Sequence, residues 1–396
     1  MNRLLVINGP NLNLLGTRRP DVYGNTTLRG LEDQLYLWGS DLDVAVAGFQ
    51  SNHEGAIIDR LHEAMGTVDG VVINPGALTH YSYAIHDAVE AIGLPTVEVH
   101  ISNIKRRESW RRHSVIAPAC VASIYGRGID GYRWALRHLV AHAAWPVESI
   151  RYGEEEDQVG DLRLPGGDGP HPVAVVLHGG YWRDQWKRDL MDLVAIDLAT
   201  RGWASWNLEY RRVGTGGGWP TTLEDVALGV DALATFAPGH RLDLDRVAAI
   251  GHSAGGHLAL WSAGRGRVAS GQPGADPAVT VGEVISLAGV ADLTRSYELG
   301  DGDGAVEDFL RRKPGDGSNR YDVADPIRNL PTGARTVLVH GTDDEQASVT
   351  LARTYVDAAT AAGDDSTLVE LEGVGHMELI EPSDAAWQRA VDNLES

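Results

Sequence analysis

The chain has 396 residues, which exceeds what one hydrophobic core usually supports, so we expect two domains. Charged residues make up 22% and hydrophobic residues 43%, a balance that is typical of globular domains and argues against disorder. The formal net charge of -21 argues against nucleic-acid and anionic-membrane partners, because no long-range attraction would offset the repulsion from phosphates.

The cysteine content and the first residues bear on where the protein works. Cys120 is the only cysteine, which excludes an intrachain disulfide and a cysteine-based zinc site. The opening MNRLLVING enters a strand-like apolar run without the longer apolar region and cleavage site typical of a signal peptide. No stretch approaches the roughly 20 apolar residues that a membrane helix needs. We therefore expect a cytoplasmic protein that acts on small molecules and binds neither membranes nor nucleic acid.

Apolar runs and helical patterns alternate over residues 1–144. The runs predicted to be buried strands are 4–8, 44–49, 71–74, 96–101 and 121–125. The helical patterns between and after them cover 28–38, 55–65, 83–92 and 131–144. Repeated strand–helix units predict a parallel sheet covered on both faces, and a flavodoxin-like domain with a five-stranded parallel sheet is the simplest closure.

The alternation stops near Trp145-Pro146, so we predict domains at 1–144 and 145–396 with a short linker at 143–149. The acidic run 154–157 is predicted to be a turn within an opening hairpin of the second domain. Strands of that domain are predicted at 161–164, 173–177, 204–208, 247–250, 284–287, 337–339 and 368–371. The chain has no internal repeat, which indicates a fusion of two different domains.

Polar side chains follow the ends of the predicted N-terminal strands, where ligands collect in parallel sheets. Glu98, His100 and Ser102 alternate along one strand, so their side chains share a face. A carboxylate beside an imidazole orients the ring and stabilises its protonated form, which makes His100 a candidate general acid. His80 and Arg111 follow neighbouring strands and are candidates for holding a carboxylate and hydroxyls.

The segment GTRRPDVYG at 16–24 is polar and bounded by glycines, which predicts a loop able to close over this site. It contains Tyr23, which is a poor base at the ordinary tyrosine pKa of about 10. Arg18 and Arg19 are near in sequence, and adjacent cations favour the phenolate form. Tyr23 is therefore a candidate base.

Several separated motifs agree in order and spacing with one family: INGPNLNLLG, the arginine–tyrosine loop, SNHEG, INPGALTH, and VEVHISN followed by ESWRRHS. Through these motifs, residues 1–144 resemble a type II 3-dehydroquinate dehydratase. The resemblance implies an anti elimination of water from 3-dehydroquinate, through an enolate, to give 3-dehydroshikimate without a metal or other cofactor. It also implies a homo-oligomer of trimers assembled into dodecamers.

Carried over residue by residue, the resemblance implies that Tyr23 removes the C2 proton and that Arg18 holds this tyrosine as a phenolate. Asn11 would steady the enolate, while His100, oriented by Glu98, would protonate the departing C1 hydroxyl. The positions that match the family's substrate-binding residues are Asn74, His80, Asp87, Ile101, Ser102 and Arg111.

Three positions depart from the family's pattern. Arg19 stands where a glutamate is expected, His86 where an arginine is common, and Trp110 where phenylalanine is usual. None of these removes a proposed chemical group, but Arg19 adds positive charge near Tyr23.

A second set of motifs begins after residue 170. GHSAG at 251–255 follows an apolar run and precedes a helical pattern, the strand–turn–helix context of a nucleophile elbow. This context predicts Ser253 as a nucleophile and the Ala254 amide as an oxyanion donor. HGGYW at 178–182 follows another predicted strand and would supply further amides, at Gly180 or Tyr181.

The acid and the base of a catalytic triad follow in the order that an α/β-hydrolase fold requires. VLVHGTDDE offers an acid at a strand end, and GVGHM offers a histidine in a loop. We assign Asp344 as the acid and His376 as the base. Asp343 is the rival for the acid, because the sequence alone does not set the turn.

Residues 148–394 thus resemble an α/β hydrolase, and HGGYW resembles the kynurenine formamidase (arylformamidase) branch. This resemblance implies that Ser253 attacks a formyl carbonyl on an aryl amine and that water then releases formate. Trp182, Trp186 and Trp219 are candidates for lining an aryl pocket, although tryptophans more often simply pack in a core. The segment 292–325 is predicted to be a cap that selects the substrate.

The leading hypothesis is a bifunctional enzyme in which a dehydratase is fused to a serine hydrolase. One alternative makes the second domain a carboxylesterase that frees quinate or shikimate from esters. Another makes it a catalytically silent binding or assembly module, although the complete set of triad and oxyanion residues counts against that hypothesis.

Overall fold

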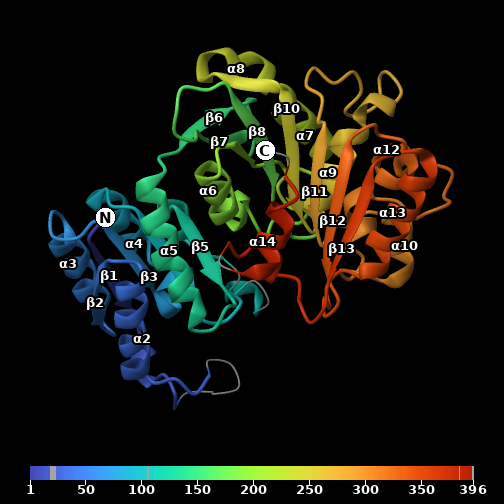
Figure 1. The fold of residues 1–396 in the computed structure, drawn as a ribbon. Coiled ribbons are helices and arrows are strands. Elements are labelled where there is room, and N and C mark those ends of the chain that lie inside the picture. The colour runs from blue at the N-terminus through green and yellow to red at the C-terminus, as the bar shows by residue number, and fades with distance from the viewer. Residues whose placement is uncertain (18–23, 105–106, 112, 383, 395–396) are drawn as a thin grey trace. The chain divides into compact units, whose positions relative to one another are not determined.

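The computed structural model describes the chain except residues 18–23, 105–106, 112, 383 and 395–396. The chain divides into two compact units, Met1–Pro146 and Val147–Ser396 (Figure 1). The division lies two residues after the boundary expected from the sequence. No helix among the described residues is both long enough and apolar enough to cross a bilayer.

The N-terminal unit is a five-stranded parallel sheet in the order β2-β1-β3-β4-β5, as expected from the sequence. Its strands are β1 (Arg3–Asn8), β2 (Ala45–Gln50), β3 (Gly70–Asn74), β4 (Thr96–His100) and β5 (Ala122–Tyr125). Its helices are α2 (Leu28–Asp41), α3 (Glu54–Ala64), α4 (Tyr83–Ile92) and α5 (Asp130–Ala144).

The sheet of this unit has an apolar core on each face, because successive side chains of a strand point to opposite faces. Along β1, Leu4 and Val6 pack with residues of α2 and α5, whereas Leu5 and Ile7 pack with residues of α3 and α4. The edge strand β2 is largely exposed. The trimer-based assembly stays a prediction for this chain.

The C-terminal unit is an eight-stranded sheet in the order β13-β12-β11-β10-β8-β9-β7-β6. The strands are β6 (Glu148–Arg151), β7 (Val159–Arg163), β8 (His171–Leu177), β9 (Ala204–Leu208), β10 (Leu242–His252), β11 (Glu283–Leu287), β12 (Arg335–Gly341) and β13 (Ser366–Leu371). The pairs β6–β7 and β7–β9 are antiparallel and the other pairs are parallel, which gives the α/β-hydrolase arrangement expected from the sequence.

Helices again cover both faces of this sheet. They are α6 (Asp192–Thr200), α7 (Thr221–Asp231), α8 (Leu233–His240), α9 (Ala254–Gly264), α13 (Val349–Ala362) and α14 (Ala385–Val391), together with three short helices between β11 and β12. The short helices are α10 (Leu293–Leu299), α11 (Ala305–Leu310) and α12 (Arg320–Ala324), and they occupy the segment predicted to be the cap. Along β8, Val175 and Leu177 pack in the core that includes α7 and α9, whereas Ala174 and Val176 pack in the core that includes α6 and α14.

The predicted linker at 143–149 was too long. Helix α5 continues to Ala144 and strand β6 begins at Glu148, because β6 pairs antiparallel with β7 and forms the opening hairpin. The acidic run 154–157 lies in the connection between these two strands, as predicted.

Candidate active sites

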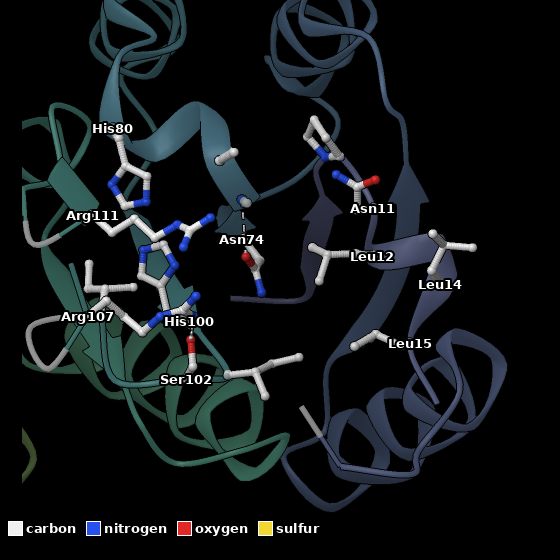
Figure 2. A pocket seen from close by; sticks show the side chains of 15 residues that line it. Asn11, Leu12, Leu14, Leu15, Asn74, His80, His100, Ser102, Arg107 and Arg111 are labelled. Atoms are coloured by element: carbon white, nitrogen blue, oxygen red, sulfur yellow. Dashed lines mark hydrogen bonds between the residues drawn. The ribbon is translucent and has the colours of Figure 1, made fainter. Parts of the chain in front are cut away.

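The first candidate site is a pocket at the carboxyl ends of β1, β3 and β4 (Figure 2). The predicted residues that line it are Asn11, Asn74, His80, His100, Ile101, Ser102 and Arg111. Figure 2 shows His80, His100, Ser102, Arg107 and Arg111 gathered on one side of the pocket, opposite the side that contains Leu12, Leu14, Leu15 and Asn11. The pocket can therefore hold a small polar molecule between a hydrogen-bonding wall and an apolar one.

A buried carboxylate lies behind the pocket and contacts its central histidine. The Oε1 atom of Glu98 is 3.0 Å from Nε2 of His100, and both side chains are buried. Hydroxyls surround this carboxylate: Thr79 Oγ1 donates at 3.2 Å and Ser114 Oγ lies 2.9 Å from each carboxylate oxygen. Burial by itself would raise the pKa of Glu98, but His100 and these hydroxyls bring it below its ordinary value. Glu98 is therefore an anion that can orient His100 and stabilise its protonated form.

The amide side chain of Asn74 is held by a buried tyrosine. Asn8 and Asn74 are paired at the ends of β1 and β3, and Tyr132 of α5 reaches both. The Tyr132 hydroxyl donates to Asn8 Oδ1 at 2.6 Å and accepts from Asn74 Nδ2 at 2.8 Å. Because the hydroxyl has one proton to donate, these contacts fix which end of the Asn74 amide faces Tyr132.

The wall opposite the apolar side chains contains His80 and Arg111, and the Trp110 ring contacts both of them. His80 Nδ1 lies 2.8 Å from the His113 carbonyl oxygen, so Nδ1 carries the proton and Nε2 is the acceptor in the neutral ring. Burial lowers the pKa of His80, which favours that neutral form. The Arg111 guanidinium lies 4.2 Å from the centre of the Trp110 ring and donates to Glu108 at 3.0 Å, which holds this cation at the pocket.

Two outcomes differ from the sequence predictions. Asp87 lies on the exposed face of α4 and does not line the pocket of this chain, because Ile85 and Val89 form the buried face of that helix. Arg107 lines the pocket and lies 3.5 Å from Ser102 Oγ, and it was not predicted although the basic run around it was visible in the sequence.

Some predictions about the loop over this site fall outside the part of the chain that the structure describes. Arg18, Arg19 and Tyr23 belong to 18–23. Their proposed roles as base and as its cationic partners stay predictions. Asn11, which precedes this loop, is held in place by its backbone N–H, which donates to Asn52 Oδ1 at 2.9 Å.

The second candidate site is centred on Ser253, at the turn between β10 and α9. Its backbone has φ 57° and ψ -119°, a conformation that residues other than glycine rarely adopt. Only glycine fits at the two positions that flank the elbow. A Cβ at Gly251 would collide with the Gly255 carbonyl, and a Cβ at Gly255 would collide with the Leu177 carbonyl. This is the strained strand-to-helix turn of a nucleophile elbow, as predicted from GHSAG.

Asp344 and His376 form a short hydrogen bond. His376 Nδ1 lies 2.6 Å from Asp344 Oδ2, and both residues follow strand ends. Backbone amides of Gln346 and Ala347 donate to the same carboxylate at 2.8 and 3.0 Å. Burial would raise the pKa of Asp344, but hydrogen bonds from His340 and His376 and from the Ala347 amide hold it far below its ordinary value.

Asp343, the alternative acid, does not contact the histidine. Its side chain is exposed and accepts a hydrogen bond from the Thr342 hydroxyl. The turn after β12 therefore presents Asp344, and not Asp343, to His376.

A second histidine brings His376 next to the elbow. His252 precedes Ser253, and its Nε2 donates to the His376 carbonyl at 2.9 Å, with the two rings 4.4 Å apart. Among the described residues, Ser253 Oγ and the His376 ring form no hydrogen bond with each other. Hydrogen bonds of this kind often tighten only when substrate is bound.

Two of the predicted oxyanion segments lie next to Ser253. Ala254 begins α9, and the first amides of a helix have no acceptor within it. The HGGYW segment runs past the elbow, since a Cβ at Gly179 would lie 3.0 Å from the Ser253 Cβ. The next residues, Gly180 and Tyr181, have φ of 114° and 57°. The segment that contains Gly180 and Tyr181 thus passes beside the elbow, and the roles of Gly180, Tyr181 and Ala254 as oxyanion donors stay predictions.

The prediction that Trp182 lines an aryl pocket is wrong. This side chain is 1% exposed and stacks on Phe309 with ring centres 4.7 Å apart, so it belongs to the core under the cap. The other two tryptophans are partly exposed: Trp186 packs against Gly180, and the Trp219 backbone amide donates to the Phe309 carbonyl at 2.7 Å. Trp182 packs here because its indole nitrogen finds a buried acceptor on α9, His257 Nδ1.

Comparisons with known proteins bear first on the N-terminal unit. The dehydroquinase class II family model matches residues 2–140. A 3-dehydroquinate dehydratase of Bacillus pumilus is 55% identical over 141 residues, which cover 36% of this chain and 96% of that protein. The chain belongs to the dehydroquinase class II family. A catabolic 3-dehydroquinase of Verticillium alfalfae is likewise 55% identical over 140 residues, covering 35% of this chain and 93% of that protein.

The remainder of this dehydroquinase chain is similar to proteins of another kind. The BD-FAE family model matches residues 161–357. A solved esterase of the Planctomycetes species Thermogutta terrifontis has a TM-score of 0.52 and 20% identity, covering 62% of this chain and 91% of that one. At this identity the likeness shows the fold alone, and it confirms the predicted α/β-hydrolase fold.

The hydroxyls around Glu98 give a prediction for the dehydroquinase unit. Since the pKa of Glu98 lies below its ordinary value, its ionised form stabilises the folded state above the unfolded-state pKa. This stabilisation is lost as the pH falls through the folded-state pKa. Thr79→Val removes one donor, so we expect about 1 to 3 kcal/mol less unfolding free energy at neutral pH. We also expect the acid-induced loss to begin at a higher pH.

Urea unfolding across the acid range measures both effects. The matched control is Thr67→Val, because the Thr67 hydroxyl bonds only to backbone carbonyls at the end of α3. A Thr79→Val protein whose stability follows the same pH curve as the control would contradict the role given to these hydroxyls.

Proposed function

We propose that the dehydroquinase unit removes water from 3-dehydroquinate to give 3-dehydroshikimate. The observation that carries this proposal is the Glu98–His100 pair at the pocket of a chain that belongs to this family. The protonated His100 ring, stabilised by the Glu98 anion, donates a proton to the departing hydroxyl. Asn74, Ser102 and Arg111 offer amide, hydroxyl and guanidinium groups to the hydroxyls and carboxylate of the substrate.

The remaining steps rest on the family resemblance. Tyr23, as a phenolate beside Arg18, takes the C2 proton, and the electron pair passes into an enolate that Asn11 steadies. Collapse of the enolate then expels the C1 hydroxyl as His100 protonates it. The pocket supports this sequence because it brings Asn11 and His100 to one cavity.

The His100→Gln variant tests this proposal. Loss of a positioned general acid lowers the rate by about 10²- to 10⁴-fold, so we expect kcat for 3-dehydroquinate to fall in that range. The measurement is the absorbance of the conjugated enone product. His86→Gln is the matched control, because this ring bonds to the Val115 carbonyl and does not line the pocket. Equal rates in the two variants would overturn the role of His100.

We further propose that the C-terminal unit is a serine hydrolase. Support comes from Ser253 on its strained turn and from the His376–Asp344 hydrogen bond of 2.6 Å. His376 takes the Ser253 proton as Oγ attacks a carbonyl, and amides of Gly180, Tyr181 and Ala254 stabilise the oxyanion. His376 then protonates the leaving group, and water releases the acyl group from the serine.

The assignment of Asp344 as the triad acid can be tested by comparing it with its neighbour Asp343. Asp344→Asn leaves the histidine in the wrong tautomer, so we expect kcat for p-nitrophenyl acetate to fall about 10³- to 10⁴-fold. Asp343→Asn should stay within about twofold, because its carboxylate does not contact the histidine. A similar fall in both variants would contradict the assignment. Absence of turnover in the unmodified protein would favour a silent module.

The substrate of this unit is best proposed as a carboxylic ester. The burial of Trp182 in the core, which removes one side chain expected to line an aryl pocket, favours an ester over an aryl formamide. The formamide stays the second candidate because the HGGYW sequence resembles kynurenine formamidase. Esters of quinate are one natural choice, since their release would supply a hydroxycyclohexane acid to the same chain.

We expect kcat/KM for an O-acyl quinate ester to exceed that for N-formylkynurenine by at least about 10-fold, which is about 1.4 kcal/mol of transition-state stabilisation. Steady-state rates on both substrates, with Ser253→Ala as the blank, measure the ratio. The reverse ratio would make the unit an arylformamidase. Turnover of simple esters alone would leave it a carboxylesterase that does not use quinate.

A further inference from the structure

The oxyanion loop of the proposed hydrolase contains a turn that its own residues disfavour. The Arg183 amide donates to the Gly180 carbonyl at 3.0 Å, which closes a turn with Tyr181 and Trp182 at its centre. These two residues have φ of 57° and 56°. Positive φ at both central positions is a conformation for glycine, asparagine or aspartate, and bulky aromatic residues persist there only when their surroundings hold them.

Two contacts hold the Trp182 side chain, and a third holds its backbone. Its ring stacks on Phe309 of α11 with an angle of 11° between the planes, and its indole nitrogen donates to His257 Nδ1 at 3.2 Å. Its carbonyl accepts from the Val213 amide at 2.8 Å. These contacts hold Trp182 in one position, and they therefore also hold the turn that contains it.

His257 connects this tryptophan to the nucleophile. It lies on α9, one helical turn after Ser253, and its amide donates to the Ser253 carbonyl at 3.2 Å. Its Nε2 lies 2.9 Å from the Ala324 carbonyl oxygen at the end of α12. A carbonyl can only accept, so Nε2 carries the proton and Nδ1 is free to accept from Trp182. Burial lowers the pKa of His257 to about 4, which keeps the ring neutral at the pH of hydrolysis.

Resting on the proposed hydrolase function, we infer that Trp182 and His257 are positioning residues that hold the amides of Gly180 and Tyr181 in register with Ser253. Ser253 is the N-cap of α9 and His257 lies in its first turn, while Trp182 is part of the oxyanion turn. The His257–Trp182 bond therefore sets the distance between nucleophile and oxyanion donors. Through Phe309 and Ala324, two cap helices hold the same two side chains.

A pair of tryptophan-to-phenylalanine variants tests this inference. Trp182→Phe keeps an aromatic ring against Phe309 but removes the donor to His257. Trp261→Phe is the matched control: Trp261 is fully buried on α9, and its indole nitrogen donates to the Val323 carbonyl at 2.9 Å, away from the oxyanion turn. Each variant removes one buried indole hydrogen bond, so a purely structural role predicts equal effects in both.

We expect Trp182→Phe to lower kcat for p-nitrophenyl acetate at least about 10-fold with KM within about twofold, because displacing the oxyanion donors weakens transition-state stabilisation far more than it weakens substrate binding. Trp261→Phe should keep kcat within about twofold, while its melting temperature falls by about as much as that of Trp182→Phe. Equal kcat in the two variants, or a loss confined to KM, would overturn the inference alone. An unmodified protein that neither hydrolyses the ester nor reacts at Ser253 with a fluorophosphonate would overturn the hydrolase proposal, and the inference with it.

Discussion

The carboxyl ends of parallel strands meet at one edge of a sheet, and both candidate sites depend on this constraint. In the dehydroquinase unit, Asn74 ends β3 and His100 ends β4, which brings them to one pocket. In the second unit, Ser253 follows β10 and the Asp344–His376 pair joins the turns after β12 and β13. Side chains that are distant in sequence converge because the strands that precede them point the same way.

Each site also contains a buried carboxylate that contacts a histidine. Glu98 is surrounded by hydroxyl donors and His100, and Asp344 by two backbone amides and two histidines. Burial of an anion is costly unless hydrogen bonds and an opposite charge compensate it. These donors supply that compensation, so the carboxylates stay ionised and each fixes the orientation of a catalytic ring. The proposed reactions differ, but both sites stabilise a buried carboxylate with hydrogen bonds and use it to orient a histidine.

Most of the fold and much of both sites could be predicted from the sequence. The pattern of apolar residues predicts the strands, and the polar residues that follow the strand ends predict the sites. The alternation of Glu98 and His100 placed them together correctly, and the glycines of GHSAG predicted the elbow. The sequence could not choose between Asp343 and Asp344, since a turn decides which carboxylate faces the histidine.

Other features depended on packing between segments distant in sequence. Trp182 was expected in a substrate pocket, and only the positions of Phe309 and His257 show that it lies in the core. Asp87 matched a family motif, yet its place on the exposed side of α4 depends on how that helix packs. A motif identifies a residue type at a position, whereas burial and contacts decide what the side chain can reach.

We propose that one chain holds two catalytic centres that work independently. The most direct test is to react Ser253 stoichiometrically with a fluorophosphonate and then to measure enone formation from 3-dehydroquinate and hydrolysis of p-nitrophenyl acetate in the same sample. We predict that ester hydrolysis disappears in proportion to labelling while dehydration is unchanged. Dehydration that falls in step with labelling, or a serine that does not react, would contradict the account.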